Sequence, residues 1–173
     1  MRKIINTMQS HSPFDAYASS YDAHFDNNPI AQQLRSIVQQ TMLRYFQKGN
    51  SILELNCGTG TDAIFLAHHG MHVLATDSSS GMIHKTGEKI QKEHLEHLIS
   101  TQQISFENLS LLTPQIFDGI LSNFGGLNVQ DVLFEFFLLF CESSPKNYLL
   151  QVHAFRGVQE RLHLFLRRSL IPK

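Results

Sequence analysis

The chain has 173 residues, a length that favours one domain and leaves little room for a second. Lys and Arg total 14 against 15 Asp and Glu, which argues against a strongly basic nucleic-acid binder. Hydrophobic residues make up 42% of the chain and charged residues 17%, enough to bury a core and unlike a disordered protein. We therefore expect one cytoplasmic domain, with no membrane span of about 18 apolar residues, no signal peptide and no disulfide framework from its two cysteines.

Residues 1–50 predict a helical lead-in before any convincing strand. Ser12 and Pro13, with an acid two residues later, are typical of a helix N-terminus. Aromatic side chains then recur at helical spacing up to Phe25. A second helix is expected to open at Asn28 and Pro29 and to end at Gly49.

From Ser51 onward, short apolar strands alternate with helices. The expected strands are 52–55, 72–77, 104–106, 117–122 and 148–154. A short helix that ends at His69 is expected after the first strand, and further helices are expected over 80–98, 129–141 and 157–173. This alternation implies a parallel α/β sheet covered on both faces, with its core in residues 51–156. The ten residues between the third and fourth strands can reach about 33 Å, whereas crossing three strands needs only about 14 Å. Strand order 3-2-1-4-5 is therefore allowed.

The strongest chemical signal is the segment 54–60, ELNCGTG, between a predicted strand and a predicted helix. Gly58 and Gly60 permit a tight turn and a close approach of a ligand to the main chain. The N-terminus of the following helix offers unpaired N–H donors. Asp77 ends the next strand, where a carboxylate can accept both hydroxyls of a ribose. Together they predict a nucleoside-binding crevice where the strand order reverses.

Two classes of cofactor use such a crevice. Residues 58–63 satisfy the loose GxGxxA form of the dinucleotide fingerprint, with Asp77 at about the expected distance. An NAD-dependent oxidoreductase is therefore one alternative. Glu54 argues against it, because a negative charge just before the glycine turn repels a pyrophosphate. The same residue suits a ligand that carries a positive amino group and a sulfonium.

Four motifs in chain order resemble those of the class I S-adenosylmethionine-dependent methyltransferases of small-molecule type. Residues 54–60 look like motif I, residues 75–82 (ATDSSSGM) resemble the second-strand motif and residues 117–128 (FDGILSNFGGLN) the fourth-strand motif. Residues 14–22 (FDAYASSYD) are similar to the lead-in of small-molecule members. The resemblance implies a Rossmann-like, doubly wound parallel sheet of order 3-2-1-4-5. It also implies S-adenosylmethionine as cofactor and methyl transfer to an N, O or C nucleophile of a small molecule.

The resemblance also implies roles for individual residues. The loop that would hold the methionine part of the cofactor consists of Glu54, Asn56, Cys57, Gly58, Thr59 and Gly60. The ribose and adenine would meet Asp77, Ser78, Met82 and either Glu107 or Asn108. Asn123 and Phe124 would face the reacting methyl group and the substrate, and Tyr17 and Tyr21 would form part of a lid. No residue stands out as a general base, so the catalytic residues stay unknown.

The sequence departs from the family pattern in two places. Asn56 stands where the family usually has a glycine, which requires an extended or left-handed backbone there. The family's sheet normally continues with two strands after the fifth, but this chain ends at Lys173, one helix too soon. We therefore expect a C-terminally shortened sheet with its fifth strand as an exposed edge. A homodimer through that edge or through the apolar helix at 129–141 is a further expectation.

Several alternatives stay open at this stage. The chain could bind the cofactor without turnover, because a shortened sheet leaves the substrate pocket open. Asp77 and Asn123 could be helix caps, and Tyr17 and Tyr21 could be core residues. The histidines include no pair joined by a carboxylate at ligand spacing, so we expect no metal site. We expect a small-molecule substrate and neither a nucleic-acid nor a membrane partner.

Overall fold

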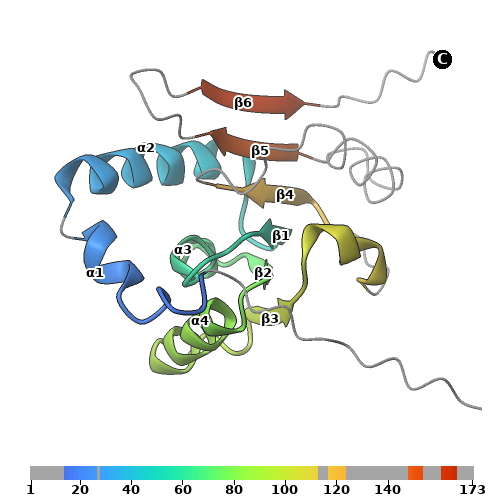
Figure 1. Ribbon diagram of the computed structural model, residues 1–173. Helices are drawn as coiled ribbons and strands as arrows, with labels where there is room; N and C mark the ends of the chain where they lie inside the picture. The colour runs from blue at the N-terminus through green and yellow to red at the C-terminus, as the bar shows by residue number, and fades with distance from the viewer. Residues whose placement is uncertain (1–13, 27, 113–116, 124–147, 154–160, 167–173) are drawn as a thin grey trace, which may run out of the picture.

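A computed structural model describes residues 14–26, 28–112, 117–123, 148–153 and 161–166 (Figure 1). They form a six-stranded sheet of order β3-β2-β1-β4-β5-β6. The elements are α1 (Tyr21–Asp26), α2 (Pro29–Tyr45), β1 (Ser51–Leu55), α3 (Thr61–His68), β2 (His72–Asp77), α4 (Ser80–Lys92), β3 (Ile99–Gln103), the 3₁₀ helix η1 (Phe106–Leu111), β4 (Gly119–Ser122), β5 (Tyr148–His153) and β6 (Arg161–Leu166). All neighbouring strands are parallel except β5 and β6. The predicted α/β architecture and the order of its first strands are therefore confirmed.

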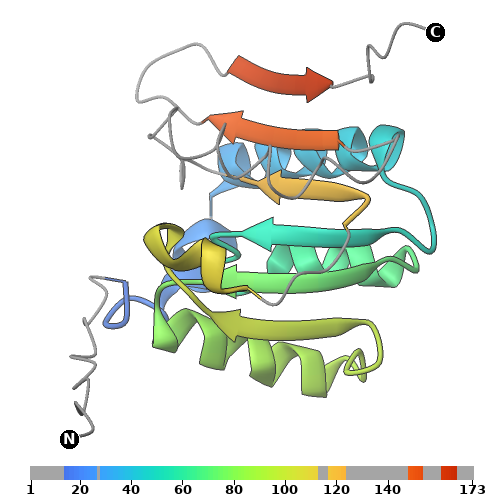
Figure 2. The same cartoon turned by 90° about the vertical axis from the view of Figure 1, so that its right-hand side faces the viewer.

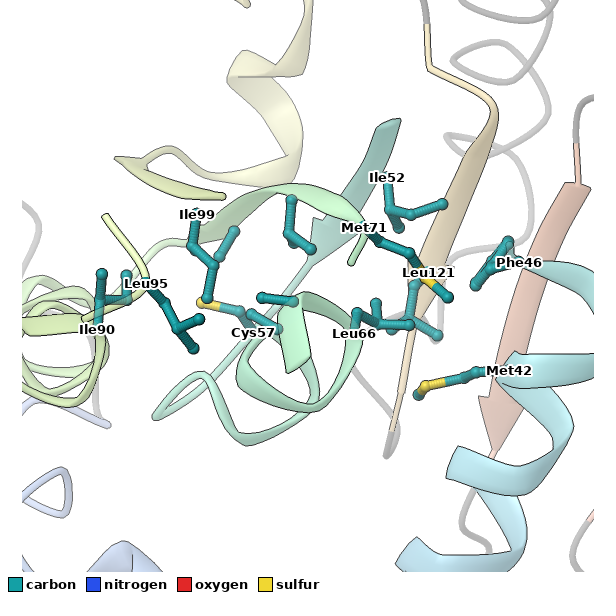
Figure 3. Close-up of a cluster of buried hydrophobic side chains, with 14 of the residues drawn as sticks. Met42, Phe46, Ile52, Cys57, Leu66, Met71, Ile90, Leu95, Ile99 and Leu121 are labelled. Carbon is teal, nitrogen blue, oxygen red and sulfur yellow. The ribbon is translucent and has the colours of Figure 1, made fainter. Parts of the chain in front are cut away.

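The two faces of the sheet carry separate parts of the core. Helices α2, α3 and α4 lie on one face, and η1 lies on the other (Figures 1 and 2). Ile52 of β1 belongs to the cluster on the α2–α4 face, together with Phe46 and Leu66 (Figure 3). Leu53 and Leu55 belong to the cluster beneath η1. Because side chains alternate along a strand, Glu54 points to the same face as Ile52, toward the helices.

Two boundaries in the middle of the chain differ from expectation. The third strand is Ile99–Gln103 rather than 104–106, and α4 ends at Lys92 rather than near residue 98. β3 lies at the edge of the sheet and only Ile99 of it is buried. An edge strand needs few apolar side chains, so its sequence lacks the run that marks β1. Of residues 104–106, the first two instead connect β3 to η1, and Phe106 is the first residue of η1.

The C-terminal prediction was wrong where the structure describes that region. Residues 161–166 form β6, antiparallel to β5 with Tyr148 opposite Leu166, and not part of a helix over 157–173. Leu162, Leu164 and Leu166 recur with the period of two that suits a strand, although the segment also fits helical spacing. The sheet therefore has one strand more than expected, and β5 is not its edge. The predicted helix at 129–141 lies outside the described residues.

The lead-in is less helical than its aromatic spacing indicates. Residues 14–20 form turns, and α1 begins only at Tyr21. The start of α2 is as predicted, because Asn28 Oδ1 accepts hydrogen bonds from the backbone N–H groups of Ile30 (3.0 Å) and Ala31 (3.2 Å). Helix α2 ends at Tyr45, four residues before Gly49. None of the helices described is long and apolar enough to span a bilayer.

Candidate functional site

The turn between β1 and α3 is held in left-handed backbone conformations. Asn56, Gly58 and Gly60 have φ values of 49°, 57° and 75°. Glycine adopts such angles without steric cost, and asparagine tolerates them better than most residues. Of the two backbone conformations expected to be possible at Asn56, extended or left-handed, the structure has the left-handed one. The Cys57 N–H donates to the Thr76 carbonyl at 2.9 Å, which fixes the turn to the end of β2.

Thr86 of α4 packs against this turn. The sequence analysis did not predict this contact. A Cβ atom at Gly60 would lie 2.4 Å from Thr86 Cγ2. Thr86 Oγ1 lies 3.0 Å from the Gly58 carbonyl oxygen. The buried Cys57 thiol lies 3.9 Å from the same hydroxyl, and burial, together with the charges of Glu54 and Asp77, raises the pKa of this thiol well above its usual value. Cys57 therefore packs as a neutral thiol and is not an activated nucleophile.

Asp77 connects the turn to the start of α4. Its Oδ2 accepts a hydrogen bond from the Gly58 N–H at 2.9 Å, and its Oδ1 accepts one from the Ser79 N–H at 2.8 Å. Burial raises the pKa of Asp77, and the backbone donors at Ser79, Gly58 and Ser78 oppose that shift. The N-cap of α4 is Ser79, whose hydroxyl accepts from the Met82 N–H at 3.2 Å. Asp77 thus connects the glycine turn to the start of α4 through hydrogen bonds and is not the N-cap of that helix.

Glu54 is the most unusual group of the site. Glu54 is only 2% exposed. In the described part of the chain, its Oε2 is the one buried side-chain oxygen or nitrogen without a hydrogen-bond partner. Burial foremost, then the charges of Asp62 and Asp77, raises the pKa of Glu54 well above its usual value. Arg35 and the Ala63 backbone N–H oppose this shift. A buried acceptor without a donor is costly unless a ligand supplies one.

A chain of side-chain hydrogen bonds crosses the point where the strand order reverses, between β1 and β4. Asn56 Oδ1 accepts from the Ser122 hydroxyl at 2.7 Å, and Asn56 Nδ2 donates to the backbone carbonyl oxygen of Asn123 at 2.7 Å. Asn123 Nδ2 in turn donates to Asp62 Oδ2 at 2.6 Å. Gln39 of α2 donates to Asp62 Oδ1 at 3.2 Å. Asp62 and Gln39 therefore fix the orientation of Asn123, a role that the spacing of these residues in the sequence does not reveal.

The lead-in is bonded to the turn through Asp22. Its Oδ2 pairs with Lys89 Nζ at 2.8 Å, and its Oδ1 accepts from the Thr59 hydroxyl. Lys89 Nζ also donates to Thr59 Oγ1 at 3.1 Å and to Thr61 Oγ1 at 3.2 Å. Burial alone would raise the pKa of Asp22, but the bonds from Lys89 and Thr59 outweigh it and lower that pKa. We call Asp22, Thr59, Thr61 and Lys89 the lead-in latch.

A second contact joins the lead-in to α4. Asp15 Oδ1 accepts from the Ser79 hydroxyl at 2.6 Å and from the Gly81 N–H at 3.0 Å. Tyr21 is half-buried, and burial raises its pKa, aided by the charges of Asp77, Asp22 and Asp62 and opposed by Arg35. Tyr17 is 63% exposed, so it is not the core residue that one interpretation allowed.

The remaining predicted residues are dispersed around this centre. Met82 is buried, whereas Ser78 is exposed. Glu107 and Asn108 are both exposed on η1, directly after β3, and Asn108 Nδ2 donates to Ser105 Oγ at 3.1 Å. Phe124 lies outside the described residues. In the described part of the chain, no three His, Cys, Asp or Glu residues form a group that could hold a metal ion.

Comparisons with known proteins agree with this geometry. Residues 52–137 match the family model described as a methyltransferase domain. The chain is 31% identical over 93 residues to an S-adenosyl-L-methionine-dependent Diels-Alderase from Talaromyces variabilis, covering 53% of this chain and 32% of that protein. It is 29% identical over 123 residues to a malonyl-[acyl-carrier protein] O-methyltransferase from Priestia megaterium, covering 69% and 42% respectively. The chain therefore spans less than half the length of the curated relatives it matches.

Among solved structures, the fold is similar to that of a protein bound to SAH. The DhpI–SAH complex superimposes with a TM-score of 0.61 at 20% identity, covering 90% of this chain and 78% of that one. A structural similarity at 20% sequence identity shows a common fold and nothing more. The residues matched by the family model include the glycine turn and the ends of β1, β2 and β4. Residues 52–137 therefore carry a class I S-adenosylmethionine-dependent methyltransferase domain.

Proposed function

We propose that this chain binds S-adenosylmethionine at the carboxyl ends of β1, β2 and β4 and transfers its methyl group to a small molecule. The observation that carries this proposal is the unpartnered, buried Oε2 of Glu54. Asp62 and Asp77 act on the same region electrostatically, so the site favours a ligand with positive charge. S-adenosylmethionine supplies such charge in its amino and sulfonium groups, and it brings the activated methyl group.

The residues present fit this cofactor. Glu54 would accept from its amino group, and the turn at Gly58, where a Cβ would meet nothing within 4 Å, leaves open space for the cofactor to approach the main chain. A carboxylate has about four acceptor positions. The two backbone bonds to Asp77 therefore leave capacity for the ribose hydroxyls.

The adenine contacts stay predictions, with Ser78 and Met82 on one side and Glu107 or Asn108 on the other. Asn123, held by Asp62 and Asn56, would orient the substrate near the methyl group. Phe124, Tyr17 and Tyr21 would enclose it. The chain's own contribution to the rate is thus position and exclusion of water, and we assign no general base.

Cofactor binding without methyl transfer is the second candidate. It is favoured by the similarity to a protein named as an S-adenosyl-L-methionine-dependent Diels-Alderase, a name that describes a cyclisation rather than methyl transfer. A nicotinamide-dependent oxidoreductase is disfavoured, because three carboxylates (Glu54, Asp62 and Asp77) lie around the turn that a pyrophosphate would have to approach. A cytoplasmic location and a homodimer also stay predictions.

Thermal unfolding with S-adenosylmethionine, S-adenosylhomocysteine and NAD tests the cofactor. A ligand at about 100 times its Kd adds roughly 2.7 kcal/mol, which raises the unfolding midpoint by about 5–10 °C at this chain length. We expect the shift with both adenosyl compounds and none with NAD. Asp77→Asn should reduce the shift, whereas Asp118→Asn should leave it unchanged, since Asp118 accepts from the Ser51 N–H at the opposite end of β1.

Transfer of a labelled methyl group to metabolites in a cell extract then separates the two candidates. A labelled small-molecule product supports the methyltransferase. Binding without any labelled product favours the second candidate, and absence of binding by a cooperatively folded protein refutes both.

A further inference from the structure

Glu54 is enclosed on every side at the centre of the sheet. It faces Ala75 of β2 and Leu121 of β4 in the strand register and is 2% exposed. Its Oε2 has no protein partner, and the Ala63 backbone N–H is the hydrogen-bond donor that acts on the carboxylate. A charged carboxylate in this position would be both desolvated and incompletely bonded, which disfavours the ionised form.

The two carboxylates whose charges act on Glu54 have hydrogen-bond donors that Glu54 itself lacks. Asp62 of α3 accepts from the amides of Gln39 and Asn123, and Asp77 of β2 accepts from two backbone N–H groups. Arg35 of α2 is the cation that acts on Glu54, and the Cys57 thiol is neutral. Glu54 therefore lacks the donors that Asp62 and Asp77 have, and a proton on its carboxyl group removes a buried charge that these donors do not compensate.

Resting on the proposed function, we infer that Glu54 is protonated in the ligand-free protein and loses this proton when a cationic ligand binds. A positive group beside Oε2 replaces the proton as the partner of the carboxylate, and the proton passes to the solvent. No covalent bond of the ligand is involved. Binding of S-adenosylmethionine is thus coupled to release of one proton, and Glu54 selects for ligands with positive charge.

Calorimetric titration in two buffers of equal pH and different ionisation enthalpy measures this release directly. With S-adenosylmethionine we expect release of up to one proton, and an affinity that rises by up to about tenfold per pH unit below the pKa of Glu54. Adenosine, which lacks the methionine part with its charged α-amino and sulfonium groups, should bind without release. Glu54→Gln keeps the shape of the side chain but cannot ionise, so it should bind S-adenosylmethionine more weakly and release nothing.

Glu96→Gln is the matched control, because Glu96 is exposed in the turn before β3 and should release the same proton as the unchanged protein. Binding of S-adenosylmethionine without proton release, or an undiminished release from Glu54→Gln, overturns the inference while leaving the proposed function intact. Absence of binding by the unchanged protein overturns both. If Glu54→Gln does not fold, the comparison of S-adenosylmethionine with adenosine on the unchanged protein still decides, since equal release refutes the inference.

Discussion

Gly60→Ala tests whether the glycine turn depends on contact with α4 or only on backbone freedom. Gly60 has a φ of 75°, and a Cβ there would lie 2.4 Å from Thr86 Cγ2 and 2.9 Å from Thr86 Oγ1. Gly58 has a φ of 57°, but a Cβ at that position would meet nothing within 4 Å. The two positions thus share the backbone requirement and differ in the space available.

The expected costs follow from this difference. A left-handed backbone costs alanine about 1–2 kcal/mol, which is the whole penalty expected for Gly58→Ala. Gly60→Ala adds overpacking against Thr86, about 1–3 kcal/mol more, for a total of about 2–5 kcal/mol. At this chain length these values correspond to losses in the unfolding midpoint of about 4 °C and about 10 °C respectively.

Urea and thermal unfolding of the two variants, without ligand, provide the measurement. Thr86→Ser removes the Cγ2 methyl group, so combining it with Gly60→Ala should recover about 0.5–3 kcal/mol relative to the sum of the single changes. Equal losses for the two glycine variants, or strict additivity with Thr86→Ser, would show that the clash does not govern this turn.

Three further outcomes are expected. Asp62→Asn loses a charged acceptor for the Asn123 and Gln39 amides and should lower the free energy of unfolding by about 1–3 kcal/mol in urea titrations; no loss would mean that Asp62 does not hold Asn123. Asp22→Asn, whose side chain is 35% exposed, should cost less than about 1 kcal/mol. It should nevertheless speed amide hydrogen exchange in α1, and unchanged exchange there would contradict a latching role. Glu54→Gln should raise the unfolding midpoint of the ligand-free protein, with a gain that grows as the pH rises above the pKa of glutamate in the unfolded chain, about 4.3; a pH-independent gain would argue against a raised pKa.

The strands at the centre of the sheet are predictable because they are buried on both faces. The segment of β1 is apolar apart from Ser51 and Glu54, and residues 72–77 coincide with β2. At Asn56 the sequence allowed an extended or a left-handed backbone, and only the structure shows that it is left-handed. The edge strand β3 lacks this signal and was missed for that reason, whereas β6 was missed because its apolar residues fit helical spacing as well as the period of a strand.

Most of the polar contacts of the site could not be predicted. Gln39 lies 23 residues before Asp62, and Thr86 lies 28 residues after Gly58. Nothing in their local sequence distinguishes them from other polar residues of α2 and α4. Only the packing of these helices on one face of the sheet brings them to the turn, so the sequence identifies the motif but not its supports.

Glu54 lowers the stability of the ligand-free protein and, for the same reason, favours the binding of a cation. Its pKa is higher in the folded protein than in the unfolded chain. Between these two pKa values the unfolded chain binds fewer protons, so the free energy of unfolding falls as pH rises through that window. Below the unfolded value both states are protonated and the penalty disappears. A cationic ligand removes the same penalty at neutral pH, so part of its binding energy comes from relieving this carboxylate, and a substitution that stabilises the free protein at Glu54 should weaken binding.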